Sequence, residues 1–490
     1  MCPAGAAGPM PTLALPLVVP WIRLDRDPKA EEEAALAAAR EPWCAGFCLF
    51  GGEAEQVRRL TARLREVSDG RVFVASDMER GAGQQVRGLR VLPDAAVWGA
   101  AASPAEVHAF GLATALDARS VGVDVLFAPV LDVRSEPRNP IVGNRSFGWD
   151  PDRVARLGAA YVEGALAGGC APTAKHWPGH GATRADSHDA VPLVAADEPT
   201  LVDRDILPFE AAVRAGCPAA MTAHVAYPAL DASGVIATFS RAAVDRLRAL
   251  DGGAGADVAV FTDALLMAGA ATLGGEAEAA RRALLAGCDA LLIPSDPARL
   301  AAEVLDGATG ALHAAAERAA VRLDTLCHRI AELSAPPSDE LQADADVAAG
   351  RVADRALKLA GGGALERLHR GAVLVVVDDD ATDDRGRVLA ARGAQAGVTV
   401  HLERFAQGRA TAPLRGDLAA DAVVCMASVR AWKGAASVSE GALARVVALV
   451  ERASIDVQVV SLTPRPIGMG VHVPGTGPDV ESAIADRLLG

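Results

Sequence analysis

The segment 175–188, which reads KHWPGHGATRADSH, concentrates side chains that can exchange protons or hold polar ligands. It carries Lys175, three histidines (His176, His180 and His188) and Asp186. Proline and glycine interrupt the segment, and these residues mark loops rather than helices. Binding and catalytic groups are often carried on loops that a rigid scaffold positions. We therefore predict a functional site at this segment.

Asp186 and His188 are two positions apart, so their side chains project to the same side of an extended loop. A carboxylate beside a histidine holds one tautomer and makes the imidazole a better proton donor and acceptor near neutral pH. The two residues are therefore a candidate acid/base pair. The alternative is a solvated pair on a loop, because a two-residue spacing is easily matched by chance.

Three further residues could do chemistry, each with an ordinary alternative. Asp263 ends an apolar segment, where a partly desolvated carboxylate either pairs with a cation or reacts, unless it caps the next helix. Arg145, in GNRSFGWDP, has a planar fork suited to carboxylates or vicinal hydroxyls, unless it forms a surface salt bridge. Asp77, after RVFVAS, is a candidate acceptor for sugar hydroxyls or a cap.

The histidines also raise the question of a metal, since zinc is bound by such ligands. A spacing of four places two ligands on one face only in a helix, and Pro178 and Gly179 prevent a helix here. We expect neither a metal nor another cofactor. We expect His180 to shape the loop and His224, after AAMTA, to line the wall of the site.

Length, composition and net charge indicate the number of domains and exclude some classes of partner. The chain has 490 residues, of which 51% are hydrophobic, so two or three domains are expected. A net charge of -14 argues against nucleic acid or an anionic membrane as the main partner. The eight cysteines lack the spacing of a zinc site or a disulfide framework, which favours reduced, buried thiols. With no convincing signal peptide or membrane span, we expect a cytoplasmic protein, and its oligomeric state stays open.

Eight short apolar segments alternate with longer segments of helical periodicity, as expected for a (β/α)8 TIM-type barrel. The candidate residues Asp77, Lys175, His176 and Asp263 fall at or just past the carboxyl ends of these segments. That rim holds the active site in such barrels. The predicted strands are 12–19, 44–50, 71–76, 121–128, 171–174, 218–223, 257–262 and 289–293.

A stretch rich in proline and acidic residues at 334–346 predicts a linker. Beyond it, buried-type segments at 372–377, 397–402, 421–427 and 456–462 predict a second, smaller α/β domain with a parallel sheet. We place a barrel domain at 1–335, a linker at 336–348 and the second domain at 349–490.

Five motifs, in chain order, resemble glycoside hydrolase family 3 and specifically its β-N-acetylglucosaminidase branch. They are the acid after the third strand (Asp77), FAPVLDV with NPIVGNRSFGWDP, KHWPGHG followed by DSH, MTAHVAYPALD, and FTDALLM. The DSH element distinguishes this branch from the rest of the family, because the branch is known for a histidine acid/base on a mobile loop where other members use a glutamate. The C-terminal domain also looks like the α/β domain of longer members.

The resemblance implies a retaining exo-β-N-acetylglucosaminidase with Asp263 as nucleophile and His188, paired to Asp186, as acid/base. Asp263 would attack the anomeric carbon while His188 protonates the leaving oxygen, and water would then release the sugar from the covalent intermediate. The resemblance also implies a set of residues that bind the terminal sugar, namely Asp77, Arg87, Arg145, Lys175 and His176.

The chain departs from the family pattern at two points. The usual DQEGGRV-like run is replaced by DMERGAGQQVRG, two residues longer, which shifts the register of Arg87. The residue after Asp263 is often a second acid and here is Ala264. Both departures bear on substrate preference.

Two alternatives to hydrolysis stay open. A phosphorylase of the same branch would use phosphate in place of water, and an uncharged histidine acid/base would not repel phosphate. A catalytically inactive carbohydrate-binding protein would be expected to lack Asp263 or His188, and both are present. The resemblance further implies recycling of internalised cell-wall sugars, with muropeptide fragments or chitin-derived oligosaccharides as the source of substrate.

Overall fold

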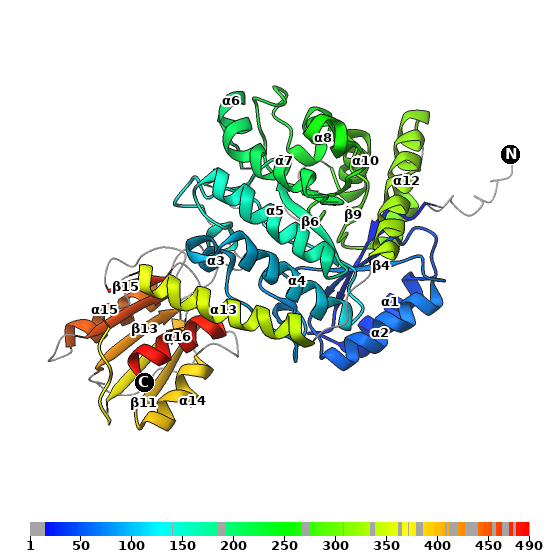
Figure 1. Ribbon diagram of the computed structural model, residues 1–490. Helices are drawn as coiled ribbons and strands as arrows, with labels where there is room; N and C mark the ends of the chain where they lie inside the picture. Colours follow the sequence, from blue (N-terminus) through cyan, green and yellow to red (C-terminus); the bar gives the residue numbers. More distant parts are fainter. Residues whose placement is uncertain are drawn as a thin grey trace, which may run out of the picture.

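The computed structural model folds the chain into a larger N-terminal α/β part and a smaller C-terminal α/β part (Figure 1). The structure describes residues 15–139, 141–184, 192–266, 274–306, 308–333, 339–360, 365–370, 372–378, 386–406, 409–410, 420–426, 440–452, 457–462, 470–473 and 477–489.

The N-terminal part is built on a curled parallel sheet with the strand order β2-β3-β4-β5-β6-β7-β8. A short strand β1 pairs in parallel with β9, and single parallel bridges join Val18 to Cys44 and Phe261 to Ala290. Through these pairings the curled sheet continues from β8 to β9, from β9 to β1, and from β1 to the segment before β3. The strands are β1 (Val18–Val19), β2 (Trp21–Arg23), β3 (Gly46–Phe50), β4 (Phe73–Ser76), β5 (Val125–Leu126), β6 (Ala171–Trp177), β7 (Ala219–Thr222), β8 (Ala259–Phe261) and β9 (Leu291–Leu292).

Each segment predicted as a strand in this part contains all or part of an observed strand, so the parallel α/β class is confirmed. The prediction missed β2, which lies in none of these segments, and it ended β6 at residue 174, whereas the strand runs to Trp177. Lys175 pairs with Met221 of β7 and forms a bridge with Val130. Lys175 and His176 therefore project from a strand, which fixes their backbone more firmly than a loop would.

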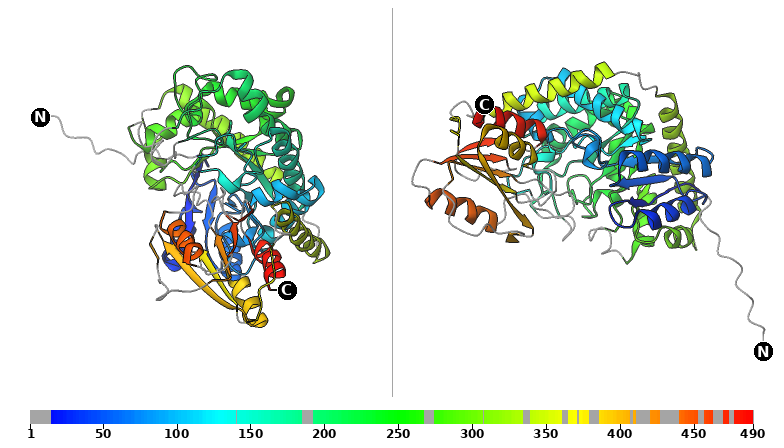
Figure 2. Two further views of the ribbon diagram at one scale, coloured as in Figure 1. Left: turned by 90° about the vertical axis from the view of Figure 1, so that its left-hand side faces the viewer. Right: turned by 90° about the horizontal axis from the view of Figure 1, so that it is seen from below.

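Helices connect the strands and cover the outside of the sheet (Figure 2). Capping sets where two of them begin: Ser103 and Glu106 form a reciprocal capping box, and Asp150 accepts the backbone N–H groups of the next turn. The helices are α1 (Pro28–Ala38), α2 (Ala54–Val67), α3 (Ala95–Ala101), α4 (Pro104–Ser120), α5 (Pro151–Ala167), α6 (Glu198–Thr200), α7 (Leu207–Arg214), α8 (Arg241–Arg248), α10 (Glu276–Ala286), α11 (Pro297–Glu303) and α12 (Gly310–Glu332).

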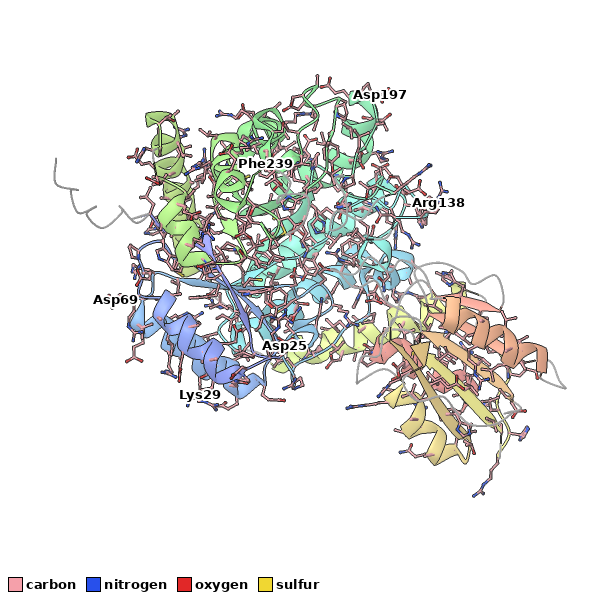
Figure 3. All side chains as sticks on the ribbon, turned by 180° about the vertical axis from the view of Figure 1, so that it is seen from behind. Asp25, Lys29, Asp69, Arg138, Asp197 and Phe239 are labelled. Atoms are coloured by element: carbon pink, nitrogen blue, oxygen red, sulfur yellow. The ribbon has the colours of Figure 1, made fainter. Side chains whose placement is uncertain are left out.

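Aromatic side chains fill the space that the sheet encloses. Phe261 meets Phe73 and Phe127 edge to face, with ring centroids 5.9 and 5.4 Å apart. All three are almost fully buried, as expected for the largest contributors to a core. Charged residues such as Asp25 and Asp69 lie instead at the periphery (Figure 3).

The C-terminal part has a sheet in the order β12-β11-β10-β13-β14-β15. All neighbours pair in parallel except β11 and β12, which are antiparallel. The four segments predicted as strands here correspond to β10, β11, β13 and β14. The elements are β10 (Val373–Asp378), α14 (Arg387–Ala396), β11 (Thr399–Ala406), β12 (Arg409–Ala410), β13 (Ala422–Met426), α15 (Glu440–Arg452), β14 (Gln458–Leu462), β15 (Val471–Val473) and α16 (Pro478–Leu488).

Helix α13 (Asp339–Leu359) lies between the two parts and packs against α3 and α4 on one side and α16 on the other (Figures 1 and 2). Arg355 of α13 donates to the carbonyl oxygen of Ala101 and to Glu106, both in the N-terminal part. The helix begins inside the range where a linker is predicted, so much of that range is packed helix.

No helix among the described residues is long and apolar enough to cross a membrane. Seven cysteines fall within the described residues as free thiols, and all but the partly buried Cys327 are buried. This agrees with the predicted reduced thiols, while Cys2 lies outside the described residues.

Two glycines allow α4 and α5 to cross closely. A Cβ atom on Gly164 would lie 2.0 Å from the carbonyl oxygen of His108, and one on Gly111 would lie 2.3 Å from that of Tyr161. Neither distance is sterically tolerable, so an added methyl group would force the helices apart.

We predict that Gly164→Ala lowers the free energy of unfolding by about 1–3 kcal/mol, the usual cost of overpacking a core. Gly350→Ala is the matched control, since a Cβ atom there meets nothing within 4 Å in helix α13. It should instead stabilise by about 0.5–1 kcal/mol, because alanine favours helix over glycine. Urea unfolding of both variants checks this, and equal effects at the two positions would contradict the close crossing.

Candidate active site

The candidate residues gather where the parallel strands of the N-terminal part end. Asp77 directly follows β4, Lys175 and His176 lie near the end of β6, and Asp263 follows β8 by one residue. Because neighbouring parallel strands place their carboxyl ends at one edge, residues distant in sequence meet there. The structure brings Asp77, Arg145, Lys175 and His176 into one connected network.

A buried carboxylate, Glu79, lies at the centre of this network. Its Oε1 atom is 2.6 Å from the Nζ atom of Lys175 and 2.7 Å from the Nη2 atom of Arg145. Its Oε2 atom accepts the Nε–H group of Arg145 at 2.8 Å, so the arginine is bound in bidentate fashion. Lys175 also donates to Oδ1 of Asp77 at 2.6 Å.

Burial makes these charges interdependent. The side chains of Glu79 and Arg145 are each 9% exposed, and that of Lys175 is 2% exposed. Burial opposes ionisation of Glu79, but Arg145 and Lys175 outweigh it and hold the pKa of Glu79 below its ordinary value. Burial likewise lowers the pKa of Lys175, yet Asp77 and Glu79 raise it overall. All of these groups are therefore charged at neutral pH.

Asp77 differs from its partners in that its side chain is 26% exposed. A carboxylate anchored by a buried lysine and open to solvent is suited to accept hydrogen bonds from a polar ligand. The buried ions of this network hold the ligand-facing group in place.

His176 is held between an anion and a cation. Its Nδ1 atom lies 2.7 Å from Oδ2 of Asp132, which can only accept, so Nδ1 carries the proton. Its Nε2 atom faces the Nη2 atom of Arg145 at 3.4 Å, and arginine can only donate. The two contacts place a proton on Nδ1 and fix the orientation of the ring.

Asp132, which is fully buried, also organises the loop that follows β6. Its Oδ1 atom accepts the backbone N–H groups of His176 at 3.2 Å and His180 at 2.6 Å. Burial raises the pKa of Asp132, but its interactions with the His176 ring and with His180 lower it overall. One carboxylate thus ties the end of the strand to the loop.

His180 shapes the loop, as predicted. It is 1% exposed, and its Nδ1 atom contacts Oγ1 of Thr183 at 2.9 Å, while Asn139 donates to its carbonyl oxygen. Burial lowers the pKa of His180 to about 4, so it is neutral at pH 7.

Asp263 is partly buried, and its Oδ1 atom accepts the backbone N–H group of Ala264 at 2.8 Å. The carbonyl oxygen of Ala264 accepts from Nε2 of the fully buried His224 at 3.2 Å. The other ring nitrogen of His224 contacts Oγ1 of Thr238 at 2.8 Å. His224 is therefore a wall residue, as predicted, and it braces the turn that presents Asp263.

Arg87 is not brought to this network. Its side chain is 62% exposed and forms an ion pair with Glu53, and its backbone forms a bridge with the same residue. The two extra residues in the loop after β4 carry it toward the start of α2. Asp186 and His188 lie outside the described residues.

Sequence reasoning missed Glu79 as a central group, although it lies two residues after Asp77. That spacing directs both side chains to one side of an extended segment, so the run DMER carried a usable signal. Asp132, the aspartate of the motif FAPVLDV, was not among the residues predicted for the site. Among the described residues, no cluster of three or more histidine, cysteine or acidic side chains is arranged to hold a metal ion.

The family model for the glycosyl hydrolase family 3 N-terminal domain matches residues 18–332. The chain belongs to glycosyl hydrolase family 3. It is therefore a glycoside hydrolase, as its motifs predicted. A relative named β-hexosaminidase from Thioalkalivibrio sulfidiphilus is 37% identical over 300 residues, covering 58% of this chain and 83% of the relative. Another from Pseudomonas aeruginosa is 39% identical over 266 residues, covering 53% and 77%.

Solved structures extend the likeness across the C-terminal part. A family 3 β-N-acetylglucosaminidase from Paenibacillus sp. str. FPU-7 superposes with a TM-score of 0.80 at 25% identity, covering 97% of this chain and 95% of that one. NagZ from Neisseria gonorrhoeae, in complex with N-trifluoroacetyl-D-glucosamine, has a TM-score of 0.55 at 28% identity. It covers 70% of this chain and 99% of its own.

The Glu79 network predicts how stability depends on pH. The pKa of Glu79 is depressed on folding, so its contribution is full above the unfolded value of 4.5 and is lost as the pH falls below it. Glu79→Gln leaves two buried cations less compensated and should cost roughly 3–5 kcal/mol at pH 7. The difference from the wild type should shrink toward about pH 3.

Urea unfolding at both pH values measures this difference. Glu53→Gln is the control, because Glu53 is 60% exposed in its pair with Arg87, and it should change stability by no more than about 0.5 kcal/mol. A Glu79→Gln cost that does not vary with pH would contradict the ionised network.

Proposed function

We propose that the protein is a retaining exo-β-N-acetylglucosaminidase that removes terminal β-linked N-acetylglucosamine. The observation that carries the proposal is Asp263, a partly buried carboxylate that follows β8 at the same edge of the parallel sheet as the network around Glu79. The printed names of the relatives, β-hexosaminidase and β-N-acetylglucosaminidase, support the substrate class.

The terminal sugar binds to the network around Glu79. Asp77 accepts hydrogen bonds from its hydroxyl groups, and His176 presents a ring whose orientation does not change. Lys175 and Arg145 keep the network ionised and contribute by positioning. A network that is already ordered before binding loses little further freedom when the sugar arrives.

Asp263 then attacks the anomeric carbon as the bond to the leaving oxygen breaks, which gives a covalent glycosyl-enzyme. The N–H group of Ala264 holds one carboxylate oxygen and so orients the attack by the other. Because His224 holds the carbonyl oxygen of Ala264, the turn resists movement during the reaction. Water attacks the same carbon in the second step, and the anomeric configuration is retained.

His188, paired with Asp186, protonates the leaving oxygen and later takes a proton from water. On one side of the pair the chain is tied down by the contact between His180 and Thr183. On the other side, Val194 donates its N–H group to the carbonyl oxygen of Ala226. The described residues on either side of the pair are therefore held by the rest of the fold.

We place this activity in the domain at 1–335, with the linker at 336–348 and a second domain at 349–490. We further propose that the protein works in the cytoplasm on fragments of recycled cell wall, such as muropeptides.

We predict that the wild type hydrolyses 4-nitrophenyl N-acetyl-β-D-glucosaminide in phosphate-free buffer. The reaction should retain the anomeric configuration, which NMR of the first-formed anomer measures. Asp263→Ala should lower kcat by roughly a thousandfold or more, the scale of losing a covalent nucleophile. His188→Ala should lower it by about 10²- to 10⁴-fold, the scale of general acid–base catalysis.

The same assay with added phosphate separates the alternatives. Turnover that requires phosphate and yields a sugar 1-phosphate would make the protein a phosphorylase. Binding of N-acetylglucosamine without turnover in either buffer would favour a carbohydrate-binding protein, and an unchanged rate in Asp263→Ala would refute the assigned nucleophile.

Arg145 and Arg87 should differ in how strongly their substitution lowers activity. Arg145→Lys removes the bidentate contact with Glu79 and should lower kcat/KM by about 10- to 100-fold, equivalent to one or two charge-assisted hydrogen bonds. Arg87→Lys, on the exposed surface, should leave kcat/KM within about twofold. Comparable losses at both positions would show that Arg87 reaches the sugar after all.

A further inference from the structure

A second polar pocket lies at the opposite end of the strands from the candidate active site. Its volume is about 140 Å³, and α8, α10 and α12 contribute to its walls. Gly287 and Cys288, which line it, precede β9, and Arg248 donates to the carbonyl oxygen of Val258, which precedes β8. The pocket therefore lies at the amino ends of the strands.

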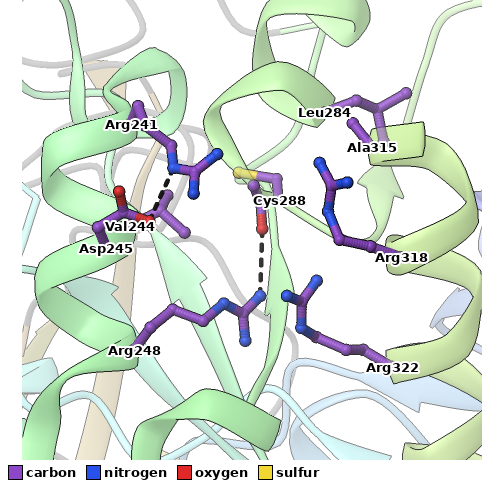
Figure 4. Close-up of a pocket in the computed structure, with 10 residues that line it drawn as sticks. Arg241, Val244, Asp245, Arg248, Leu284, Cys288, Ala315, Arg318 and Arg322 are labelled. Atoms are coloured by element: carbon purple, nitrogen blue, oxygen red, sulfur yellow. Dashed lines mark hydrogen bonds and ion pairs between the residues drawn. The ribbon is translucent and has the colours of Figure 1, made fainter. Parts of the chain in front are cut away.

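Four arginines line this pocket, and Figure 4 shows their guanidinium groups directed into the same space. Arg241 and Arg248 come from α8, and Arg318 and Arg322 come from α12. Each pair is spaced so that both side chains lie on one face of its helix. We call these four residues the arginine pocket.

Two of the four arginines have a structural task. Asp289, which is fully buried, accepts from Nη2 of Arg248 at 2.7 Å and from Nη1 of Arg322 at 2.9 Å. Its Oδ2 atom also accepts the backbone N–H group of Val260 at 2.8 Å. These contacts clamp the helices to the start of the strands.

A matching clamp shows that two arginines suffice for this task. Asp124 precedes β5, accepts the backbone N–H group of Val74 in the neighbouring strand, and is held by Arg65 and Arg119. As at Asp289, two arginines from two different helices and one backbone N–H group of the neighbouring strand hold the carboxylate. Arg241 and Arg318 are therefore additional to the clamp.

The additional arginines leave the pocket with excess positive charge. Arg241 pairs with Asp245 at 2.7 Å, but both side chains are more than half exposed, which makes this a weak pair. Among the described residues, no ion pair or hydrogen bond of the Arg318 side chain is found. Four arginines against Asp245 and Asp289 leave two positive charges uncompensated, in a chain whose net charge is -14.

Such an arrangement is costly unless an anion completes it. Like charges one turn apart on a helix, as in Arg318 and Arg322, repel each other. Guanidinium groups match tetrahedral oxyanions with paired N–H donors and bind them more specifically than lysine does. The pocket is also well below the roughly 300–1,000 Å³ of sites for larger ligands. Its size and charge suit a small dianion.

We propose that the arginine pocket binds a phosphate group, either as free inorganic phosphate or as the phosphate of a small monoester. The site is separate from the candidate active site and does not depend on the proposed function. Arg318 and Arg241 supply the ligand-directed charge, and Arg322 contributes the donors that Asp289 does not use. Arg248 lines the pocket, but its Nη1 and Nη2 groups already donate to Asp289 and to the carbonyl oxygens of Ala256, Val258 and Gly287.

Isothermal titration calorimetry of the full chain, at an ionic strength of about 0.15 M, tests the proposal with two probes. Inorganic phosphate and glucose 6-phosphate distinguish the free ion from a monoester, and binding of either supports the site. Arg318→Glu should weaken binding of the preferred probe by at least about tenfold, and Arg241→Gln by severalfold.

Arg329→Glu is the matched control. Arg329 is exposed on the same helix, does not line the pocket, and gives the same change in net charge. It should leave the dissociation constant within about twofold, and circular dichroism should show that all three variants are folded. Phosphate binding that survives Arg318→Glu, equal losses in Arg329→Glu, or no binding of either probe to the wild type would overturn the proposal.

Discussion

The contact on which the candidate site depends is the buried pairing of Glu79 with Lys175 and Arg145. It joins the loop after β4, the segment before α5 and strand β6, which are far apart in the chain. A buried ion is stable only when its partners are fixed, so each of the three holds the other two in place. The exposed Asp77 carboxylate takes its position from this arrangement through Lys175.

Asp132 extends the same constraint to the loop. It binds the His176 ring and the backbone of His180, so the residues after β6 cannot move independently of the strand. Gly181 follows directly, and a Cβ atom there would lie 1.8 Å from the carbonyl oxygen of Val133. The start of the loop therefore packs on the segment after β5 without room for a side chain at Gly181.

Strands could be predicted from the sequence because they are apolar runs bounded by polar residues. Asp77 and Lys175 could be predicted as site residues because they end such runs. It did not indicate the role of Glu79, since that role depends on distances to residues 66 and 96 positions away. Arg87 was included through the family resemblance, whereas in the structure it pairs with Glu53 on the exposed surface, and local sequence does not show where a lengthened loop leads. The extension of β6 was missed because Pro172 and Pro178 bracket it as they would a loop.

Both ends of the curled sheet use a buried carboxylate between two cations, and they differ in what else is charged nearby. At the amino ends, Asp124 and Asp289 each take two arginines and a backbone N–H group, which fixes helices to strands. At the carboxyl ends, Glu79 is similarly paired, and a further carboxylate, Asp77, reaches solvent. In each case the buried carboxylate is satisfied by groups of the chain itself. The two ends differ in the charged group beyond this pairing, which is the partly exposed carboxylate of Asp77 at the carboxyl ends and the guanidinium groups of Arg241 and Arg318 at the amino ends.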